Sequence, residues 1–225
     1  MEIKVLLKIA ALGGILYVVL QMMGQMFIQV GGQEPAFNAG QEEIMSFFMA
    51  RNPGLARAGA FLSMLAFIPF IFFVGALWQR LKSGEGKSGW LSNITLGAGL
   101  LIVAVQLVSG AGWTIEFNRL NSPRIPELTR FQFDFGNYLF AASWIMMACM
   151  LLSTGILSIV TKALPIWTGW FGIVTSLGLI IATGCWYSAS GIVFAPVTLF
   201  WLWLIVVSVI LFRRVTTQGD HVQRF

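Results

Sequence analysis

The chain has 225 residues, of which 57% are hydrophobic and only 10% are charged, and its mean hydropathy is +0.81. This composition excludes an ordinary water-soluble domain, because soluble domains carry about 25% charged residues. The formal net charge of +5 does not indicate nucleic-acid binding, since no loop combines clustered Arg or Lys with aromatic residues. We therefore expect an integral membrane protein that has the lipid bilayer, and no nucleic acid, as its partner.

Six apolar stretches, each ended by charged or turn-forming residues, predict six transmembrane helices. A helix rises about 1.5 Å per residue, so a stretch of about 20 residues crosses a hydrocarbon layer of about 30 Å. No linker is long enough to separate a second domain, so the sequence predicts one all-α transmembrane domain over residues 1–225. The predicted spans are residues 5–30, 55–78, 90–115, 137–160, 167–187 and 194–212.

The first predicted span carries a glutamine at every fourth position: Gln21, Gln25 and Gln29. Four residues are close to one helical turn, so these side chains form a stripe on one face of the helix. Exposing three amides to lipid would cost free energy, and the stripe therefore needs polar partners. Three explanations remain open: hydrogen bonds between helices, a polar pocket open toward the outer face, and contact with the transmembrane helix of a partner protein.

The first predicted outer loop, residues 31–54, contains an amphipathic segment at residues 41–49. Ile44, Phe47 and Phe48 fall at helical spacing behind an acidic first turn, which favours a short helix on the outer surface.

Prolines mark where two other segments should bend or end. Pro69 lacks the backbone N–H of a helical residue, so the second predicted span should bend near the middle of the membrane. Pro123 and Pro126 exclude a continuous helix across the second predicted outer loop, residues 116–136.

The basic residues are divided unequally between the two predicted sides of the membrane. With both termini inside, the inner segments hold nine of the fourteen basic residues, including every lysine, whereas the outer segments combine five arginines with six acids. This asymmetry follows the positive-inside rule and predicts that the N and C termini are cytoplasmic. The inner basic residues are Lys4, Lys8, Arg80, Lys82, Lys87, Lys162, Arg213, Arg214 and Arg224.

The predicted outward pocket is the candidate ligand-binding site. Gln106 in the third span lies, by helix rise, at a depth similar to that of the glutamine stripe, and Trp113 and Trp186 would supply aromatic walls. Arg57 and Glu116 are expected at the outer ends of their helices. The candidate ligand-binding residues are Gln21, Gln25, Gln29, Gln106, Trp113, Trp186, Arg57 and Glu116.

Residues that carry chemistry are scarce within the predicted spans. No Asp, Glu, Lys, Arg or His lies in the central part of any span, whereas ion-coupled transporters generally keep such groups there. The only histidine, His221, lies in the C-terminal tail, and we expect neither a metal site nor catalytic residues. The sequence identifies no cofactor. Glu116, Asp134 and Cys185, the groups an intramembrane enzyme would have to use, do not make a catalytic constellation.

One segment resembles a motif of a bacterial protein family. Residues 164–172 read Leu-Pro-Ile-Trp-Thr-Gly-Trp-Phe-Gly, and the last apolar helix after them ends in Leu-Phe-Arg-Arg. This Pro-x-Trp-x-Gly-Trp turn, six spans and a basic turn after the second span resemble uncharacterised six-span inner-membrane proteins with a membrane domain of unknown function. The resemblance implies a multi-pass protein of the bacterial cytoplasmic membrane, and the family has no assigned activity that could be carried over. The turn also has a structural purpose, because proline begins the helix and tryptophans anchor it at the interface.

The sequence thus favours a non-enzymatic membrane protein that binds an apolar or amphipathic molecule, such as a lipid, quinone or pigment. An accessory role in a larger membrane complex, or in a homo-oligomer, remains open beside it. The alternative is a small-solute transporter or channel, which needs a continuous polar path to the inside. An intramembrane enzyme is the third option.

Overall fold

A computed structural model describes residues 3–119, 125–187 and 191–222, with side chains from residue 5 to residue 214. These parts of the chain contain helices and connections but no β-strand, which confirms the predicted all-α fold. The elements are α1 (Ile3–Gln29), α2 (Gln41–Met49), α3 (Pro53–Leu65), α4 (Phe67–Glu85), α5 (Trp90–Asn118), α6 (Pro126–Thr161), α7 (Ile166–Gly184), the 3₁₀ turn η1 (Gly191–Phe194) and α8 (Ala195–Val222).

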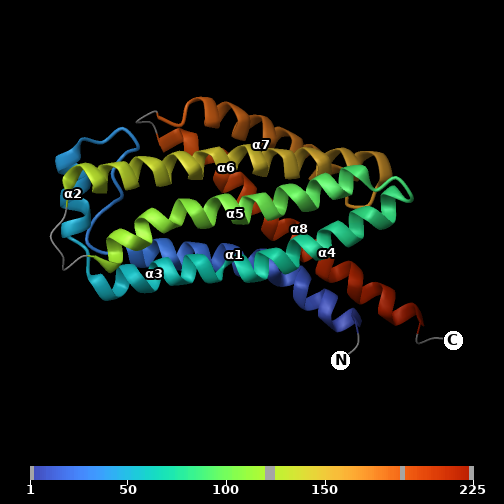
Figure 1. Ribbon diagram of the computed structural model, residues 1–225. Helices are drawn as coiled ribbons and strands as arrows, with labels where there is room; N and C mark the ends of the chain where they lie inside the picture. Colours follow the sequence, from blue (N-terminus) through green and yellow to red (C-terminus); the bar gives the residue numbers. More distant parts are fainter. Residues whose placement is uncertain (1–2, 120–124, 188–190, 223–225) are drawn as a thin grey trace.

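Within the described residues, six helical segments are long and apolar enough to cross a membrane, with α3 and α4 together forming the second and η1 with α8 forming the sixth. The chain is therefore a multi-pass membrane protein. The start of α1 and the end of α8 lie at the same end of the bundle, which we call the termini end (Figure 1). The opposite end, formed by α2 and residues 30–40, is the loop end.

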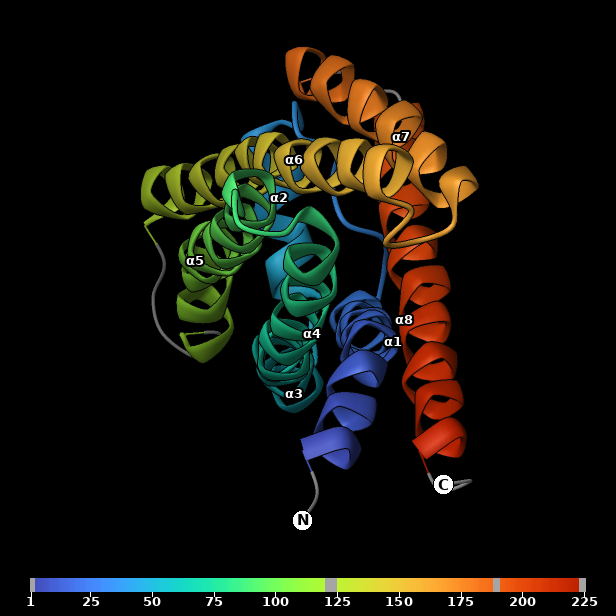
Figure 2. The same cartoon turned by 90° about the vertical axis from the view of Figure 1, so that its right-hand side faces the viewer.

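The six spans form a ring that follows the order of the chain (Figure 2). Each span packs against the next one, and α8 packs back against α1. The fourth span, α6, is the most enclosed, because it also contacts α2 and α4.

The second span bends where the sequence predicts. The helix is interrupted at Ala66, between α3 and α4, because Pro69 cannot donate a backbone hydrogen bond to the carbonyl group of Leu65. At the start of this span the side chain of Asn52 accepts hydrogen bonds from the backbone N–H groups of Gly54 and Leu55. The cap fixes the beginning of α3 at the loop end.

The predicted short helix on the first outer loop is confirmed as α2. Its apolar face, Ile44, Phe47 and Phe48, is buried in a small second core beside Phe117 and Phe133, close to where α5 ends and α6 begins. The helix is thus anchored on the bundle by aromatic packing.

The predicted second outer loop differs from the structure. α5 continues to Asn118 and α6 already begins at Pro126, so much of the segment 116–136 is helical; residues 120–124 and their prediction lie outside the described residues. Pro126 is tolerated because the first turn of a helix needs no backbone N–H donor. Arg130 and Asp134 form an ion pair of 3.7 Å along this first part of α6.

The main hydrophobic core fills the interior of the ring toward the termini end. Its largest fully buried side chains come from facing spans, so this half of the ring has a packed centre. They include Phe70, Phe73, Leu77, Leu81, Trp144, Met147, Leu151, Phe200, Trp203 and Leu204.

Candidate ligand-binding site

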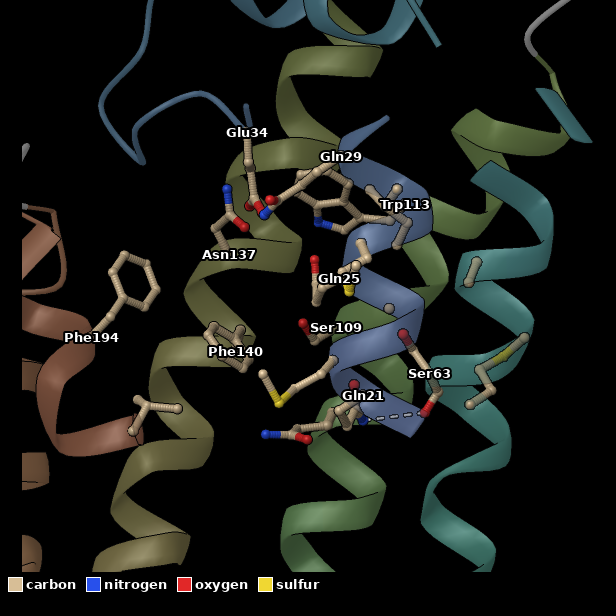
Figure 3. Close-up of a pocket in the computed structure, with 18 of the residues that line it drawn as sticks. Gln21, Gln25, Gln29, Glu34, Ser63, Ser109, Trp113, Asn137, Phe140 and Phe194 are labelled. Carbon is tan, nitrogen blue, oxygen red and sulfur yellow. Dashed lines mark hydrogen bonds between the residues drawn. The ribbon is translucent and has the colours of Figure 1, made fainter. Parts of the chain in front are cut away.

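A cavity of about 800 Å³ lies inside the ring at the loop end. The side chains of five spans and of η1 form its walls, and residues 33–37, which follow α1, lie over it. Figure 3 shows side chains from several helices converging on this space. Apolar surface predominates in the lining, and the polar groups are few.

One face of α1 supplies the longest polar wall. Tyr17, Gln21, Gln25 and Gln29 follow at intervals of four residues, all line the cavity, and Gln33 continues the series beyond the end of the helix. The amide nitrogen of Gln21 donates a hydrogen bond of 3.2 Å to the backbone carbonyl group of Ser63 (Figure 3). Among the described residues, no partner hydrogen-bonds to the side chains of Gln25 or Gln29. Their amides are therefore open to a bound molecule.

The deep end of the cavity is closed by a hydrogen-bond network around Gln106. The hydroxyl group of Tyr17 donates to Oε1 of Gln106 over 3.3 Å, and Nε2 of Gln106 donates to the hydroxyl group of Ser143 over 3.1 Å. The Ser143 hydroxyl group in turn donates to the backbone carbonyl group of Phe140 over 2.6 Å. Gln106 is 8% exposed, and its amide joins α1, α5 and α6. Its side chain is thus engaged by the protein itself.

The loop-side part of the cavity holds groups that lack such partners. Asn137 on α6 is 3% exposed, and its amide nitrogen has no hydrogen-bond partner within the described parts of the chain. A buried unpaired donor costs about 1–3 kcal/mol, so this nitrogen is poised for an acceptor. Asn137, Gln29 and Glu34 all line the cavity, and Figure 3 labels them in its loop-side part. Burial raises the pKa of Glu34 from 4.5 to about 7, although the positive charge of Arg51 opposes that shift.

Arg51 holds residues 30–32 in place, the segment that leads from α1 to the roof of the cavity, residues 33–37. Its guanidinium group donates to the carbonyl oxygen of Val30 over 3.2 Å and to that of Gly32 over 2.9 Å. The same group lies 3.8 Å from the ring centroid of Phe47 on α2, a cation–π contact. Because Arg51 is only 6% exposed, these contacts fix the turn after α1 against α2.

Phe37 ties the other end of the roof to the opposite side of the ring. Its ring centroid lies 5.3 Å from that of Phe194 in η1 and 5.9 Å from that of Trp186 after α7. Phe37 and Phe194 line the cavity, whereas Trp186 supports Phe37 from behind.

The structure brings five of the eight predicted site residues together in the cavity lining. These are Gln21, Gln25, Gln29, Gln106 and Trp113. The ring of Trp113 is held in the wall by an aromatic cluster around it, with centroid distances of 5.3 to 6.1 Å.

The other three predicted residues lie at the expected end of the bundle but outside the cavity lining. Trp186 stands behind Phe37. Arg57 is exposed and donates from Nε over 3.2 Å to the carbonyl oxygen of Phe117, where it caps the C-terminal end of α5. Glu116 is 5% exposed and accepts a hydrogen bond of 3.2 Å from Thr129, so it faces the α5–α6 interface.

Sequence reasoning missed several lining residues, and some of them had a detectable signal. Tyr17 extends the glutamine stripe by one helical turn, and Ser109 follows Gln106 at a spacing of three. Asn137 precedes the lining residue Phe140 in the same way. Glu34 gave no signal, because the path of a loop does not follow from helical periodicity.

The Pro-x-Trp-x-Gly-Trp segment lies at the termini end, far from this cavity. Pro165 precedes the first residue of α7, and Trp167 and Trp170 are 56% and 57% exposed, as residues of a membrane interface would be. The segment thus has the geometry of an interfacial anchor.

Fold and cavity together define a multi-pass α-helical membrane protein with a pocket of ligand size. Among the described residues, no three His, Cys, Asp or Glu side chains are grouped so that they could hold a metal ion. Comparisons with models of protein families, with curated proteins and with solved structures find no match. The family resemblance of the Pro-x-Trp-x-Gly-Trp segment therefore stays a prediction.

Proposed function

We propose that the chain is a non-enzymatic membrane protein that binds an uncharged amphipathic molecule, of the lipid or quinone kind, in the loop-end cavity. The observation that carries this proposal is that unpartnered amide groups line a mainly apolar cavity. The amide nitrogen of Asn137 and the amides of Gln25 and Gln29 have no hydrogen-bond partner among the described residues, while methionine and aromatic side chains form much of the remaining wall. A head group with hydrogen-bond acceptors and an apolar body would match both the amides and the wall.

The size of the cavity supports a small-molecule ligand. Pockets for small molecules usually enclose about 300–1,000 Å³, are mainly apolar and contain a few polar groups that fix orientation. The cavity of about 800 Å³ falls in that range. A quinone ring presents two carbonyl acceptors, which the amide donors of Asn137 and Gln25 could bind.

We place the protein in a bacterial cytoplasmic membrane with the loop end outward. The support for this orientation is the charge asymmetry, because basic residues of the termini end such as Arg80, Lys82 and Lys162 have few acidic neighbours in sequence. The ligand would then occupy the outer half of the bilayer.

A transport pathway receives less support from the structure. Below the Tyr17–Gln106 network, the described ring interior is filled by Phe70, Phe73 and Met147, each with no exposed surface. Within the described residues, the cavity lining ends above these three buried side chains and does not reach the termini end.

Tryptophan fluorescence provides the test, because Trp113 and Trp201 line the cavity and a quinone quenches tryptophan emission on contact. The purified full chain in detergent is titrated with decylubiquinone, and saturable quenching is expected. Trp113→Phe should remove part of the saturable signal. Trp170→Phe should leave the absolute size of the saturable decrease unchanged, since Trp170 lies near the start of α7 and outside the cavity lining.

Asn137→Leu and Gln25→Leu should each weaken the binding of decylubiquinone by about tenfold, the effect of losing one hydrogen bond of about 1.4 kcal/mol. Gln41→Leu is the matched control, because it removes an amide at the loop end outside the cavity lining. Quenching that does not saturate, or that is equal in all variants, would refute a specific site. A stoichiometric polypeptide that co-purifies in mild detergent would instead support the accessory role.

A further inference from the structure

A second, smaller cavity opens at the termini end between α1, α4 and α8. Its volume is about 170 Å³, well above the roughly 10–15 Å³ needed to admit one water molecule. Half of its lining is apolar and half is polar or positively charged. The lining residues are Leu7, Ala11, Ala76, Gln79, Arg80, Ser83, Leu211 and Arg214.

The two arginines of this cavity converge on one backbone oxygen. Nε of Arg80 donates to the carbonyl oxygen of Ala163 over 2.9 Å, and Nη1 of Arg214 donates to the same oxygen over 2.8 Å. Two positive charges, from α4 and α8, are therefore held side by side next to a partly apolar wall. Their mutual repulsion opposes this arrangement unless a negative charge accompanies them.

No acidic side chain of the described residues forms an ion pair with either arginine. Glu85, at the end of α4, is directed elsewhere, because its two carboxylate oxygens accept from the backbone N–H groups of Leu91 and Ser92 over 3.0 and 2.9 Å. The arginine pair thus lacks a counter-charge from the described protein, while the cavity beside it has room for one.

The chemistry of the pair selects the counter-ion. A guanidinium group has five N–H donors in a planar fork, and one donor from each arginine is used by the Ala163 oxygen. The remaining donors match the oxygens of a phosphate group, which arginine recognises in preference to smaller acceptors. Gln79 and Ser83 are exposed at the rim and can add polar contacts.

We propose that this cavity binds a phosphate group, and that the phosphate is supplied by the head group of an anionic membrane phospholipid. Basic pockets between transmembrane helices near the cytoplasmic surface suit such head groups. Leu7, Ala11 and Leu211 provide apolar surface beside the arginines, as the glycerol and first acyl carbons of a lipid require. The site is separate from the loop-end cavity, and it does not depend on what that cavity binds.

Native mass spectrometry of the delipidated full chain tests the proposal, with phosphatidylglycerol and phosphatidylcholine titrated in parallel. Removing both charges with Arg80→Gln and Arg214→Gln should weaken phosphatidylglycerol binding by about 25-fold or more, since each arginine would lose charge-assisted hydrogen bonds to the phosphate that contribute a factor of at least about five. The matched control is Lys87→Gln with Lys162→Gln, which removes two charges from the same end outside the cavity. The control should change phosphatidylglycerol binding less than about twofold.

Competition with inorganic phosphate tests whether the bound phosphate group comes from a lipid head group or from a free phosphate ion. If it displaces phosphatidylglycerol, the phosphate site is confirmed and a free anion is shown to enter it; if it does not, the lipid is the ligand. Equal losses in the arginine and lysine variants would overturn the proposal in favour of general surface charge. A lower unfolding temperature with an unchanged preference for phosphatidylglycerol would also overturn it, because the arginines would then only brace the Ala163 carbonyl group. If the glutamine variants do not fold, Arg80→Lys with Arg214→Lys takes their place: it keeps both charges but removes the guanidinium forks, and it should still weaken phosphatidylglycerol binding more than the lysine control does.

Discussion

The close contact of α1 with α3 makes a quantitative prediction about the wall of the loop-end cavity. A Cβ atom added at Gly59 would lie 2.6 Å from the carbonyl oxygen of Gly24, and 2.9 Å and 3.1 Å from Cγ1 and the backbone nitrogen of Ile28. Carbon–oxygen contacts between helices normally span about 3.3–3.6 Å. Two of these three atoms belong to the backbone, so Gly59→Ala must push the two helices apart by about 0.5 Å or more.

The expected cost combines two terms of opposite sign. Overpacking of a tight contact costs about 1–3 kcal/mol, whereas replacing glycine by alanine within a helix gains up to about 1 kcal/mol. Gly97→Ala in α5 provides the control, because no atom lies within 4 Å of its added Cβ and only the favourable term applies. The two variants should therefore differ in free energy of unfolding by about 1–3 kcal/mol, with Gly59→Ala the less stable.

Unfolding in mixed detergent and dodecyl sulfate, followed by circular dichroism, measures this difference. Gly59→Ala should also weaken decylubiquinone binding, because moving α1 away from α3 displaces Gln21 from the carbonyl group of Ser63. Equal stability of the alanine variants at positions 59 and 97 would refute the close α1–α3 contact, and with it the position assigned to the glutamine face.

Three further predictions concern individual polar groups. Gln106→Leu should lower the free energy of unfolding by about 1–2 kcal/mol, since it breaks two buried hydrogen bonds, whereas Gln25→Leu should lower only ligand binding; chemical unfolding and quenching separate the two effects. Because burial raises the pKa of Glu34 from 4.5 to about 7, the folded state binds the proton more tightly than the unfolded state. Stability should therefore fall as the pH rises from about 4.5 to about 7 and level off above, and thermal unfolding of Glu34→Gln should lack this dependence. Arg51→Gln should speed hydrogen exchange at residues 30–37, measured by mass spectrometry, because the carbonyl groups of Val30 and Gly32 lose their donors.

The parts of the fold that the sequence predicted are those set by features within one segment: its hydropathy, its prolines and its residue spacing. The apolar stretches gave the six spans, Pro69 gave the bend in the second span, and the spacing of Ile44, Phe47 and Phe48 gave α2. The early start of α6 was missed, because the polar first turns after Pro126 read as a loop. Their helical conformation depends on packing against α5, which a single sequence does not reveal.

The sequence predicted how far along the bundle the candidate site residues lie, but not the direction in which their side chains point. Helix rise for Gln106, and positions near the span ends for Trp186, Arg57 and Glu116, placed these residues toward the loop end, yet only Gln106 lines the cavity. The direction of a side chain around the ring axis depends on which neighbours its helix packs against. The glutamine stripe succeeded because its direction was fixed internally, by residues of one helix that share one face.

The difference between Gln106 and Asn137 is the strongest argument that the loop-end cavity has an occupant. Both polar atoms of the Gln106 amide, its oxygen and its nitrogen, are hydrogen-bonded within the protein, to Tyr17 and Ser143. Asn137, in contrast, keeps an unpartnered donor beside the open space. A purely structural role for this polarity would bring the partners together, as it does around Gln106. A bound molecule that accepts from Asn137 would remove the cost of its burial, and it would stabilise the fold by RT ln(1 + [L]/Kd). The temperature of thermal unfolding should therefore rise with decylubiquinone concentration in the native chain, and it should rise much less in Asn137→Leu.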